Sequence, residues 1–312
     1  MVRVSLSDRV PLPADPAGAV DYLRHALFER GVPVYVLFDP ILGAPLGRPW
    51  SDEGAPAAEH VISLAQCGLP LESSPYFVRI ERPLSYLLDE TLAVAKKENS
   101  SGYGARSVCG WFTSPHEPVE LRSQMQRLIQ QRDANGRRWI FRFYDPRVMQ
   151  HLGFILGRPF MAPGISHWFF LDAASKLVSQ HRMSATEPLN VVGDDKLPLL
   201  DRVSLVNQAH SHWQSIDSSI PADAFGRLFE AAEQAICSGL DIDQTADCVS
   251  FMLHRCVLHP HVERHPLVAE WLEDAKQGRR SYADAAAEAP STVWEEITSG
   301  RWIDAWQGAH HG

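Results

Sequence analysis

Trp139-Ile-Phe-Arg-Phe-Tyr-Asp-Pro146 is an apolar run that ends in a proline, a pattern that recurs in the first half of the chain. Proline cannot continue the ladder of a central strand, but its fixed φ and missing N–H suit the first position of a helix. Each such proline therefore predicts a switch from strand to helix. Three earlier runs end in the same way: Val34-Tyr-Val-Leu-Phe-Asp-Pro40, Tyr76-Phe-Val-Arg-Ile-Glu-Arg-Pro83 and Cys109-Gly-Trp-Phe-Thr-Ser-Pro115.

The third run carries the strongest helix signal. Ser114, Pro115 and Glu117 provide an N-cap, a proline at the first helical position and an acidic side chain at the third, which together predict a capping box. The apolar residues that follow recur with helical period on one face, and polar residues fill the other positions. We expect an amphipathic helix that buries Leu121, Met125, Leu128 and Ile129.

Asn135-Gly136 predicts a tight turn, and the alternation after it predicts a strand with Trp139, Phe141 and Phe143 on one face. The prolines at 83, 115 and 146 are 32 and 31 residues apart, close to the ~30 residues of a strand-helix-strand unit. A helix over roughly 15–30 precedes these units, and the run His167-Trp-Phe-Phe-Leu-Asp172 predicts a fifth strand.

Glycines and prolines interrupt the chain from about 157 to 198, after which the period becomes helical at Ala224, Leu228, Ala231 and Ala235, with Gly239 as a C-cap. We therefore predict an α/β N-terminal lobe over 1–172, with four to five strands alternating with helices. A linker over 173–198 and a mainly α-helical lobe over 199–312 follow.

Composition excludes several classes of protein. The 312 residues contain no run of ~18 apolar residues, and the first ten lack the apolar core of a signal peptide, so we expect a cytoplasmic protein without membrane spans. Five cysteines without a C-x-x-C pair favour buried, reduced thiols. Residues 195–312 contain 18 acidic and 9 basic side chains, a balance that repels phosphate and argues against a nucleic-acid partner.

Known catalytic motifs are absent from the sequence, which predicts neither an enzyme nor a cofactor. If the strands were parallel, their ends would bring seven polar residues to one edge of the sheet. These are Asp39, Glu81, Arg82, Ser114, His116, Asp145 and Arg147. Most of them have an ordinary role as helix caps or ion-pair partners. The alternative is a hydrolase-like α/β enzyme that uses Asp39, His116 and Asp145.

Three further clusters have both a structural and a functional interpretation. His254, Cys256, His259, His261 and His265 are either residues of a helix end and the turn after it, or ligands of a metal. Arginines accumulate against only Asp133 and Asp145, as on a solvated helix face plus a strand end or on a patch for an acidic protein surface, and they lie at 122, 127, 132, 137, 138, 142 and 147. Near the end of the chain, Trp294, Trp302 and Trp306 are typical of core packing or of interface anchors.

The stretch from Trp111 to Leu152 resembles the type VI secretion effector adaptor family, also called Tap or Tec and first described only as a domain of unknown function. The residues that carry the resemblance are Trp111-Phe-Thr-Ser-Pro115 and Gly136-Arg-Arg-Trp-Ile-Phe-Arg-Phe-Tyr-Asp-Pro-Arg-Val148, with Arg-Phe-Tyr-Asp-Pro-Arg as its specific centre. Weaker similarity extends over roughly residues 18–172, and the C-terminal half matches only in being helical.

The resemblance implies a bacterial, cytoplasmic and non-catalytic chaperone that binds a toxin effector and loads it onto the VgrG or PAAR spike. Neither a nucleic acid nor a membrane is an implied partner. The residues that match the motif are Arg142, Tyr144, Asp145 and Arg147, which either contact a partner or hold the lobe together. Possible interface residues are Arg122, Arg127 and the three tryptophans near the C-terminus.

Overall fold

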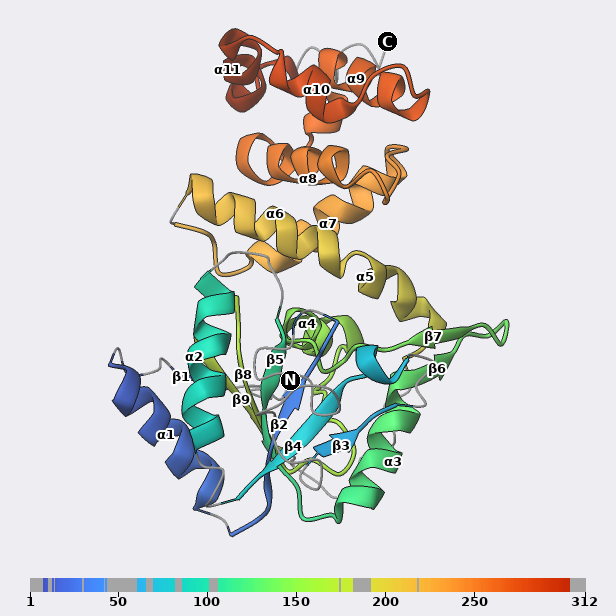
Figure 1. Cartoon of the computed structure of the whole chain (residues 1–312). Coiled ribbons are helices and arrows are strands. Elements are labelled where there is room, and N and C mark those ends of the chain that lie inside the picture. Colours follow the sequence, from blue (N-terminus) through green and yellow to red (C-terminus); the bar gives the residue numbers. More distant parts are fainter. Residues whose placement is uncertain are drawn as a thin grey trace. The chain divides into compact units, whose positions relative to one another are not determined.

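A seven-stranded antiparallel sheet forms the centre of the first of two units in the computed structural model of the chain (Figure 1). The units are Met1–Pro198 and Leu199–Gly312, and each is described by itself. The structure describes residues 8–10, 13, 15–29, 31–41, 43, 61–65, 70–81, 86–100, 106–173, 175–181, 192–217 and 219–303.

The strand order is β1-β9-β8-β5-β2-β4-β3, and every neighbouring pair is antiparallel. The strands are β1 (Asp8–Val10), β2 (Val34–Phe38), β3 (Val61–Ser63), β4 (Tyr76–Ile80), β5 (Val108–Thr113), β8 (His167–Leu171) and β9 (Leu177–His181). The predicted alternation of strands and helices, including the fifth strand at 167–172, is confirmed. The parallel arrangement considered from the sequence is wrong, which changes the set of side chains that meet at each edge of the sheet.

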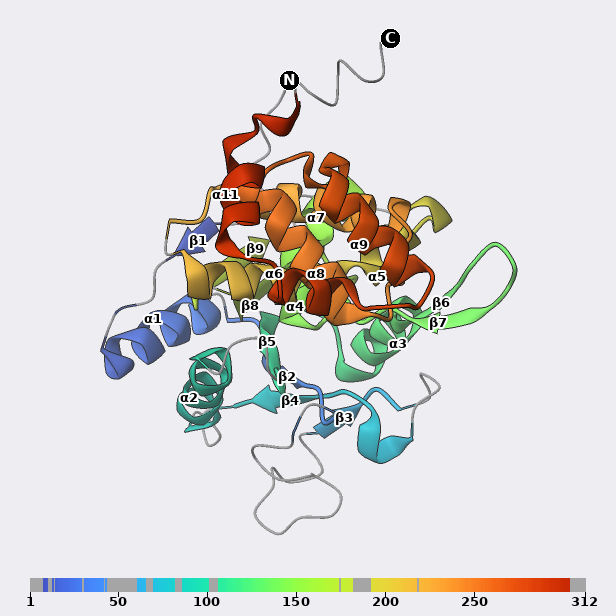
Figure 2. The same ribbon diagram turned by 90° about the horizontal axis from the view of Figure 1, so that it is seen from above.

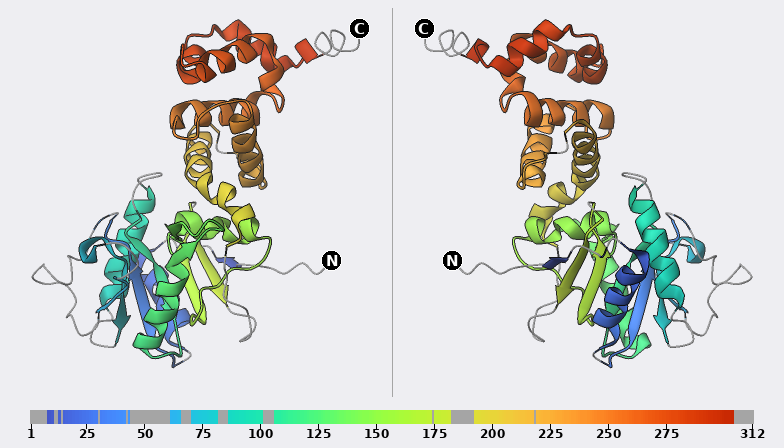
Figure 3. Two further views of the ribbon diagram at one scale, coloured as in Figure 1. Left: turned by 90° about the vertical axis from the view of Figure 1, so that its right-hand side faces the viewer. Right: turned by 90° about the vertical axis from the view of Figure 1, so that its left-hand side faces the viewer.

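Both faces of the central strands are covered, and for that reason β2 and β5 are uninterrupted runs of buried residues. Helices α1 (Pro16–Phe28) and α2 (Tyr86–Ser100) lie on one face and share a hydrophobic core with Val36, Val78 and Trp111 (Figures 1 and 3). Stacked and edge-on rings, among them Tyr35, Phe112 and Trp168, form the other face.

Proline begins three helices of this unit, at Pro16, Pro118 in α3 (Pro118–Ile129) and Pro146 in α4 (Pro146–Leu156). The capping box predicted at Ser114 is wrong, because α3 begins three residues later than Pro115, after Glu117, whose side chain makes no capping bond. The Ser114 hydroxyl instead donates to the Gly164 carbonyl oxygen at 2.6 Å and accepts from the His116 N–H at 3.1 Å. The predicted apolar face of α3 is confirmed, with Leu121, Met125, Leu128 and Ile129 buried.

The aromatic stretch after Asn135-Gly136 is only partly a strand. A short hairpin pairs β6 (Gln130–Arg132) with β7 (Arg138–Ile140), and Gly136 in its turn has φ +77°. Beyond Ile140 the chain turns, with the Asp145 N–H donating to the Arg142 carbonyl at 3.0 Å. Phe143 and Tyr144 are consecutive and both buried, which a strand with one exposed face does not allow.

The segment expected to be a linker, 173–198, contains strand β9. Leu177 and Val178 are buried, and the Asp172 N–H donates to the Lys176 carbonyl at 2.9 Å, so a tight turn joins β8 to β9. The division between the units falls after Pro198. Strand β9 has only five residues, and glycines and prolines lie on both sides of it in the sequence. For that reason the sequence pattern predicts a linker where the structure has a strand.

The second unit is helical, as predicted from the change of period. Its elements are α5 (Leu197–Asp201, across the division), α6 (Val203–Ile216), α7 (Ala224–Cys237), α8 (Thr245–Leu253), a π-helical turn (His254–Leu258), α9 (Pro266–Lys276), α10 (Tyr282–Ala287) and α11 (Ser291–Ser299). Helices α6, α7 and α8 pack on one another (Figure 2). Ala224, Leu228, Ala231 and Ala235 are all buried, and Gly239 follows the C-cap of α7 with φ +93°.

No helix within the described ranges combines the length and the apolar character that crossing a bilayer requires.

Candidate functional site

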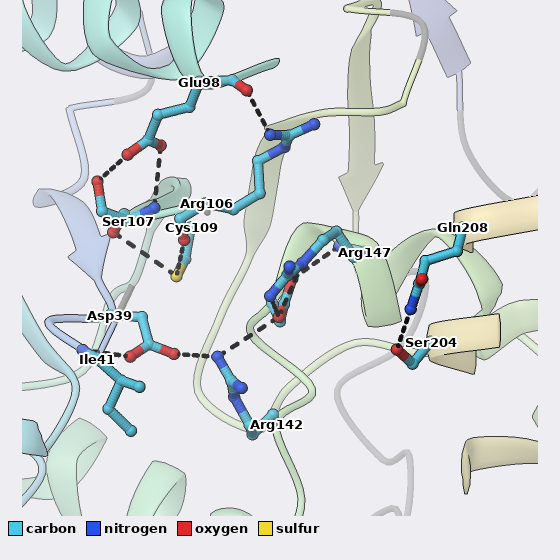
Figure 4. Close-up of polar contacts among 11 residues, drawn as sticks. Asp39, Ile41, Glu98, Arg106, Ser107, Cys109, Arg142, Arg147, Ser204 and Gln208 are labelled. Atoms are coloured by element: carbon cyan, nitrogen blue, oxygen red, sulfur yellow. Dashed lines mark hydrogen bonds and ion pairs between the residues drawn. The ribbon is translucent and has the colours of Figure 1, made fainter. Parts of the chain in front are cut away.

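The motif Arg142–Arg147 forms a group of ion pairs with Asp39, which lies 103 residues before Arg142 in the chain (Figure 4). Arg142 Nη2 lies 2.6 Å from Asp39 Oδ2 and 3.5 Å from Asp145 Oδ2. Arg147 holds the same Asp145 carboxylate with Nη2 at 2.7 Å and Nε at 3.0 Å. We call Asp39, Arg142, Asp145 and Arg147 the motif cluster.

Secondary structure fixes both carboxylates of the motif cluster. Asp39 follows β2, where its N–H donates to the Ser107 carbonyl and its Oδ1 accepts from the Ile41 N–H at 3.1 Å. Asp145 is the N-cap of α4 and accepts from the Arg147 N–H at 2.9 Å. A negative charge at this position also complements the dipole of the helix. The two acids therefore tie the start of α4 to the end of a central strand.

Burial dominates the electrostatics of the motif cluster. It raises the pKa of Asp39, whose residue is fully buried, and Arg142 offsets only part of that rise. Burial opposes the charge on Arg142 as well, but the carboxylates of Asp39 and Asp145 outweigh it and raise the pKa of the guanidinium. Burial and the Asp39 charge raise the pKa of Tyr144, so its hydroxyl stays protonated at neutral pH. These groups neutralise one another, as expected of a structural network.

A second polar group, which sequence patterns do not predict, lies beside the motif cluster. Helix α2 continues through Ser100, so the Glu98 carboxylate accepts from the Ser107 N–H at 2.9 Å and from the Ser107 hydroxyl. The Arg106 guanidinium donates to the Glu98 carbonyl at 2.6 Å. Burial, with the nearby Asp39 charge, raises the pKa of Cys109 well above its ordinary value, so this thiol is not poised as a nucleophile.

The antiparallel sheet separates the residues of the hydrolase alternative. The Asp39 N–H bonds to Ser107, whereas the Ser114 N–H bonds to the Pro33 carbonyl at the other end of β2. Pro33 and Asp39 are six residues apart along an extended strand, roughly 20 Å at ~3.3 Å per residue. His116 lies beyond Ser114 and pairs with Glu120 at 3.1 Å. Asp39 and Asp145 meet, but His116 does not join them.

Glu81 follows β4 at the same end of the sheet as Ser114, since Ile80 pairs with Val34. It forms an exposed ion pair with Arg79 at 3.2 Å. Arg82 lies outside the described residues.

The predicted interface residues have different environments. Arg122 and Arg127 are exposed on α3. Trp302 is 7% exposed and donates to the Ile297 carbonyl at 3.1 Å, so it belongs to the interior and not to a contact surface. Trp294 is half-buried against the rings of Trp271 and His254. Trp306 lies outside the described residues.

The C-terminal histidines pack on aromatic rings. His254 lies in the π-helical turn, with its ring centroid 4.6 Å from Trp294 and its Nδ1 2.8 Å from the Tyr282 hydroxyl. His259 and His265 both lie against Trp302. In the described part of the chain, no three histidine, cysteine or acidic side chains are arranged to hold a metal ion.

Acid is expected to weaken the helical unit through His254. Burial lowers the pKa of His254 from 6.5 to about 4, so the unfolded chain binds more protons than the folded chain between these values. The free energy of unfolding therefore falls as the pH drops from 6.5 towards 4, by at most about 3 kcal/mol from this group. Urea unfolding at pH 7.5 and pH 4.5 measures the change. His254→Phe keeps an aromatic ring without the titration and should flatten the profile relative to wild type, and an unchanged profile would contradict the assignment.

No curated protein and no solved structure shows a significant match to the chain. A family model does match, and its region runs from the start of β2 to the end of α4 and contains the whole motif cluster. Residues 34–156 thus match the family described as Domain of unknown function (DUF4123).

Proposed function

We propose that the chain is a cytoplasmic, non-enzymatic adaptor that binds a type VI secretion toxin effector and loads it onto the VgrG or PAAR spike. In this proposal the first unit docks on the spike component and the helical unit holds the effector.

The observation that carries the proposal is the Arg-Phe-Tyr-Asp-Pro-Arg motif within the matched residues 34–156. The motif is the centre of the resemblance to effector adaptors. Its charged groups pair with one another and with Asp39, which suits a scaffold that presents contact surfaces elsewhere.

A groove in the helical unit supports the assignment of the effector to that unit. It has a volume of about 430 Å³ and lies between α6 and α8. Val249 and Leu253 supply apolar surface, and Gln208 and His212 line the opposite side. These two residues share a helix face with Ile216, which is 66% exposed, because the three are spaced four residues apart. An apolar surface with a polar rim is the composition of a protein contact.

Co-expression of the full chain with its neighbouring genes tests the adaptor function. We expect a toxin effector to remain bound to the chain through size exclusion. Deletion of the gene should abolish delivery of that effector while the spike still assembles. A chain that elutes identically with and without every neighbouring toxin would overturn the proposal.

The substitution Ala246→Glu tests the groove. Ala246 is an exposed groove residue in the first turn of α8, where an added carboxylate is compatible with the helix dipole and should leave the melting temperature unchanged. It places a charge against the apolar groove, so we expect effector affinity to fall at least tenfold in a binding titration. Ala269→Glu is the matched control, since Ala269 is exposed on α9 and does not line the groove. Equal affinity of the two variants would contradict the groove assignment.

A further inference from the structure

The hairpin after α3 exposes a group of arginines. It comprises β6, β7 and the turn between them, and it projects past the end of the helix (Figures 1 and 2). Arg132, Arg137 and Arg138 are all exposed, and none of them lies within ion-pair distance of a carboxylate of the described residues. We call residues 130–140 the arginine hairpin.

Two of these arginines oppose each other directly, because Arg132 pairs with Arg138 in the register of the hairpin. Like charges at opposed positions on one face of a hairpin destabilise it. One guanidinium nitrogen of Arg132 donates to the Gly136 carbonyl at 3.1 Å, which supplies a hydrogen bond but no negative charge. The arrangement therefore has an electrostatic cost that an acidic partner would relieve.

The nearby carboxylates already bond to the backbone of the turn. Asp133 Oδ1 accepts from the N–H groups of Asn135 and Arg137 at 3.0 and 2.8 Å. Asp194 Oδ2 accepts from the Ala134 N–H at 2.8 Å. These contacts hold the tip of the hairpin in place, so the arginines extend from a fixed frame.

The opposite face of the hairpin anchors it to the unit. Gln131 and Trp139 form the pair that faces inward, and Gln131 is 6% exposed with its Nε2 donating to the Leu128 carbonyl at 2.8 Å. The Phe141 N–H donates to the Ile129 carbonyl at 2.8 Å. Because the base of the hairpin is already fixed in this way, its backbone needs little further ordering when a partner binds. The smaller entropic cost of binding favours affinity.

We propose that the arginine hairpin docks an extended acidic segment of a partner protein, with carboxylates paired to Arg132 and Arg138. The inference rests on the proposed function in that it names a partner surface of the adaptor. Guanidinium groups pair with carboxylates in bidentate geometry, and in an extended segment every second side chain points to the same face. A nucleic acid is disfavoured because Trp139, the aromatic residue of the hairpin, belongs to the inward-facing pair, is only partly exposed, and packs its ring against Phe141 instead of presenting it for base stacking.

Fluorescence anisotropy on the full chain tests the inference with a labelled decapeptide of alternating Glu and Ser. The wild-type chain should bind this peptide, should not bind the matching Gln and Ser peptide, and should lose affinity between 50 and 300 mM salt. Arg132→Gln with Arg138→Gln should weaken binding at least tenfold. The melting temperature should stay the same or rise, because the opposed charges are gone.

The matched control is Arg227→Gln with Arg279→Gln, which removes two exposed arginines that already pair with Asp223 and Asp274. It should keep the wild-type affinity within twofold. An equal loss in this control, an unchanged affinity in the hairpin variant, or tighter binding of an oligothymidine would overturn the inference. Salt-sensitive self-association that disappears in the hairpin variant would also overturn it, by assigning the surface to a second copy.

The test separates the inference from the proposed function. If the hairpin variant binds the acidic peptide as wild type does while effector co-purification persists, only the inference fails. If no effector co-purifies but the arginine hairpin binds the acidic peptide selectively, the proposed function fails while the inferred docking surface is still supported.

Discussion

Gly110→Ala adds a single methyl group, and we expect it to lower the free energy of unfolding of the first unit by at least about 3 kcal/mol. A Cβ at this position in β5 would lie 2.4 Å from the Phe169 carbonyl oxygen and 2.7 Å from Trp168 Nε1. The first of these neighbours is backbone of the adjacent strand and cannot move without breaking the sheet. Gly110 also has φ +136°, a conformation that residues with a Cβ rarely adopt.

Thermal unfolding followed by tryptophan fluorescence measures this effect. For a unit of this size, 3 kcal/mol corresponds to a decrease of about 6–12 °C in the melting temperature. Gly153→Ala is the control, because Gly153 lies in α4 and an added Cβ has no neighbour within 4 Å. It should stabilise the helix by about 0.5–1 kcal/mol. Wild-type stability of the Gly110 variant would show that β5 and β8 do not approach so closely.

Asp145→Ala is expected to cost about 3 kcal/mol, because one carboxylate performs two structural tasks. It caps α4 through the Arg147 N–H, and loss of such a cap costs about 1 kcal/mol. The Asp145 carboxylate also neutralises the charge of Arg147, and together with Asp39 it neutralises the charge of Arg142. Removal of a buried ion-pair partner costs ~3–5 kcal/mol, and the partial exposure of both arginines reduces this part of the effect.

Asp145→Asn separates the two tasks, since asparagine caps helices about as well as aspartate but carries no charge. We expect urea unfolding to place this variant between wild type and Asp145→Ala. Effector capture by both variants should fall only as far as the folded fraction falls. An Asp145 variant that folds like wild type and fails to capture effector would assign the motif cluster to a partner interface.

The motif itself could be predicted from the sequence, but its environment could not. Asp145 and Pro146 are adjacent residues whose preference for a helix start is local, and the structure confirms it. Arg142 also pairs with Asp39, which precedes Pro40, and nothing in the sequence around Asp39 predicts this pairing. A contact across 103 residues depends on the strand order, and single-strand patterns do not encode that order.

Two predictions failed because a tertiary contact was stronger than a local one. Ser114 had the sequence of an N-cap, but its hydroxyl bonds to Gly164, and the helix begins at the next suitable proline. The aromatic run after Ile140 has the alternation of a strand, but both Phe143 and Tyr144 find buried positions when the chain turns into α4. Local propensity was outweighed in both places by the burial of groups from distant parts of the chain.

Local sequence patterns predict where the chain changes period, which faces of its helices are apolar, where Gly136 turns a hairpin, and how α4 begins. These features depend on residues within one or two turns of each other, so short-range sterics and hydrogen bonding suffice to predict them. Tertiary structure, in contrast, sets the antiparallel direction of the strands and places Asp39 with the motif and away from His116. Strand direction and register are set by the simultaneous burial of two sheet faces, which no single segment specifies.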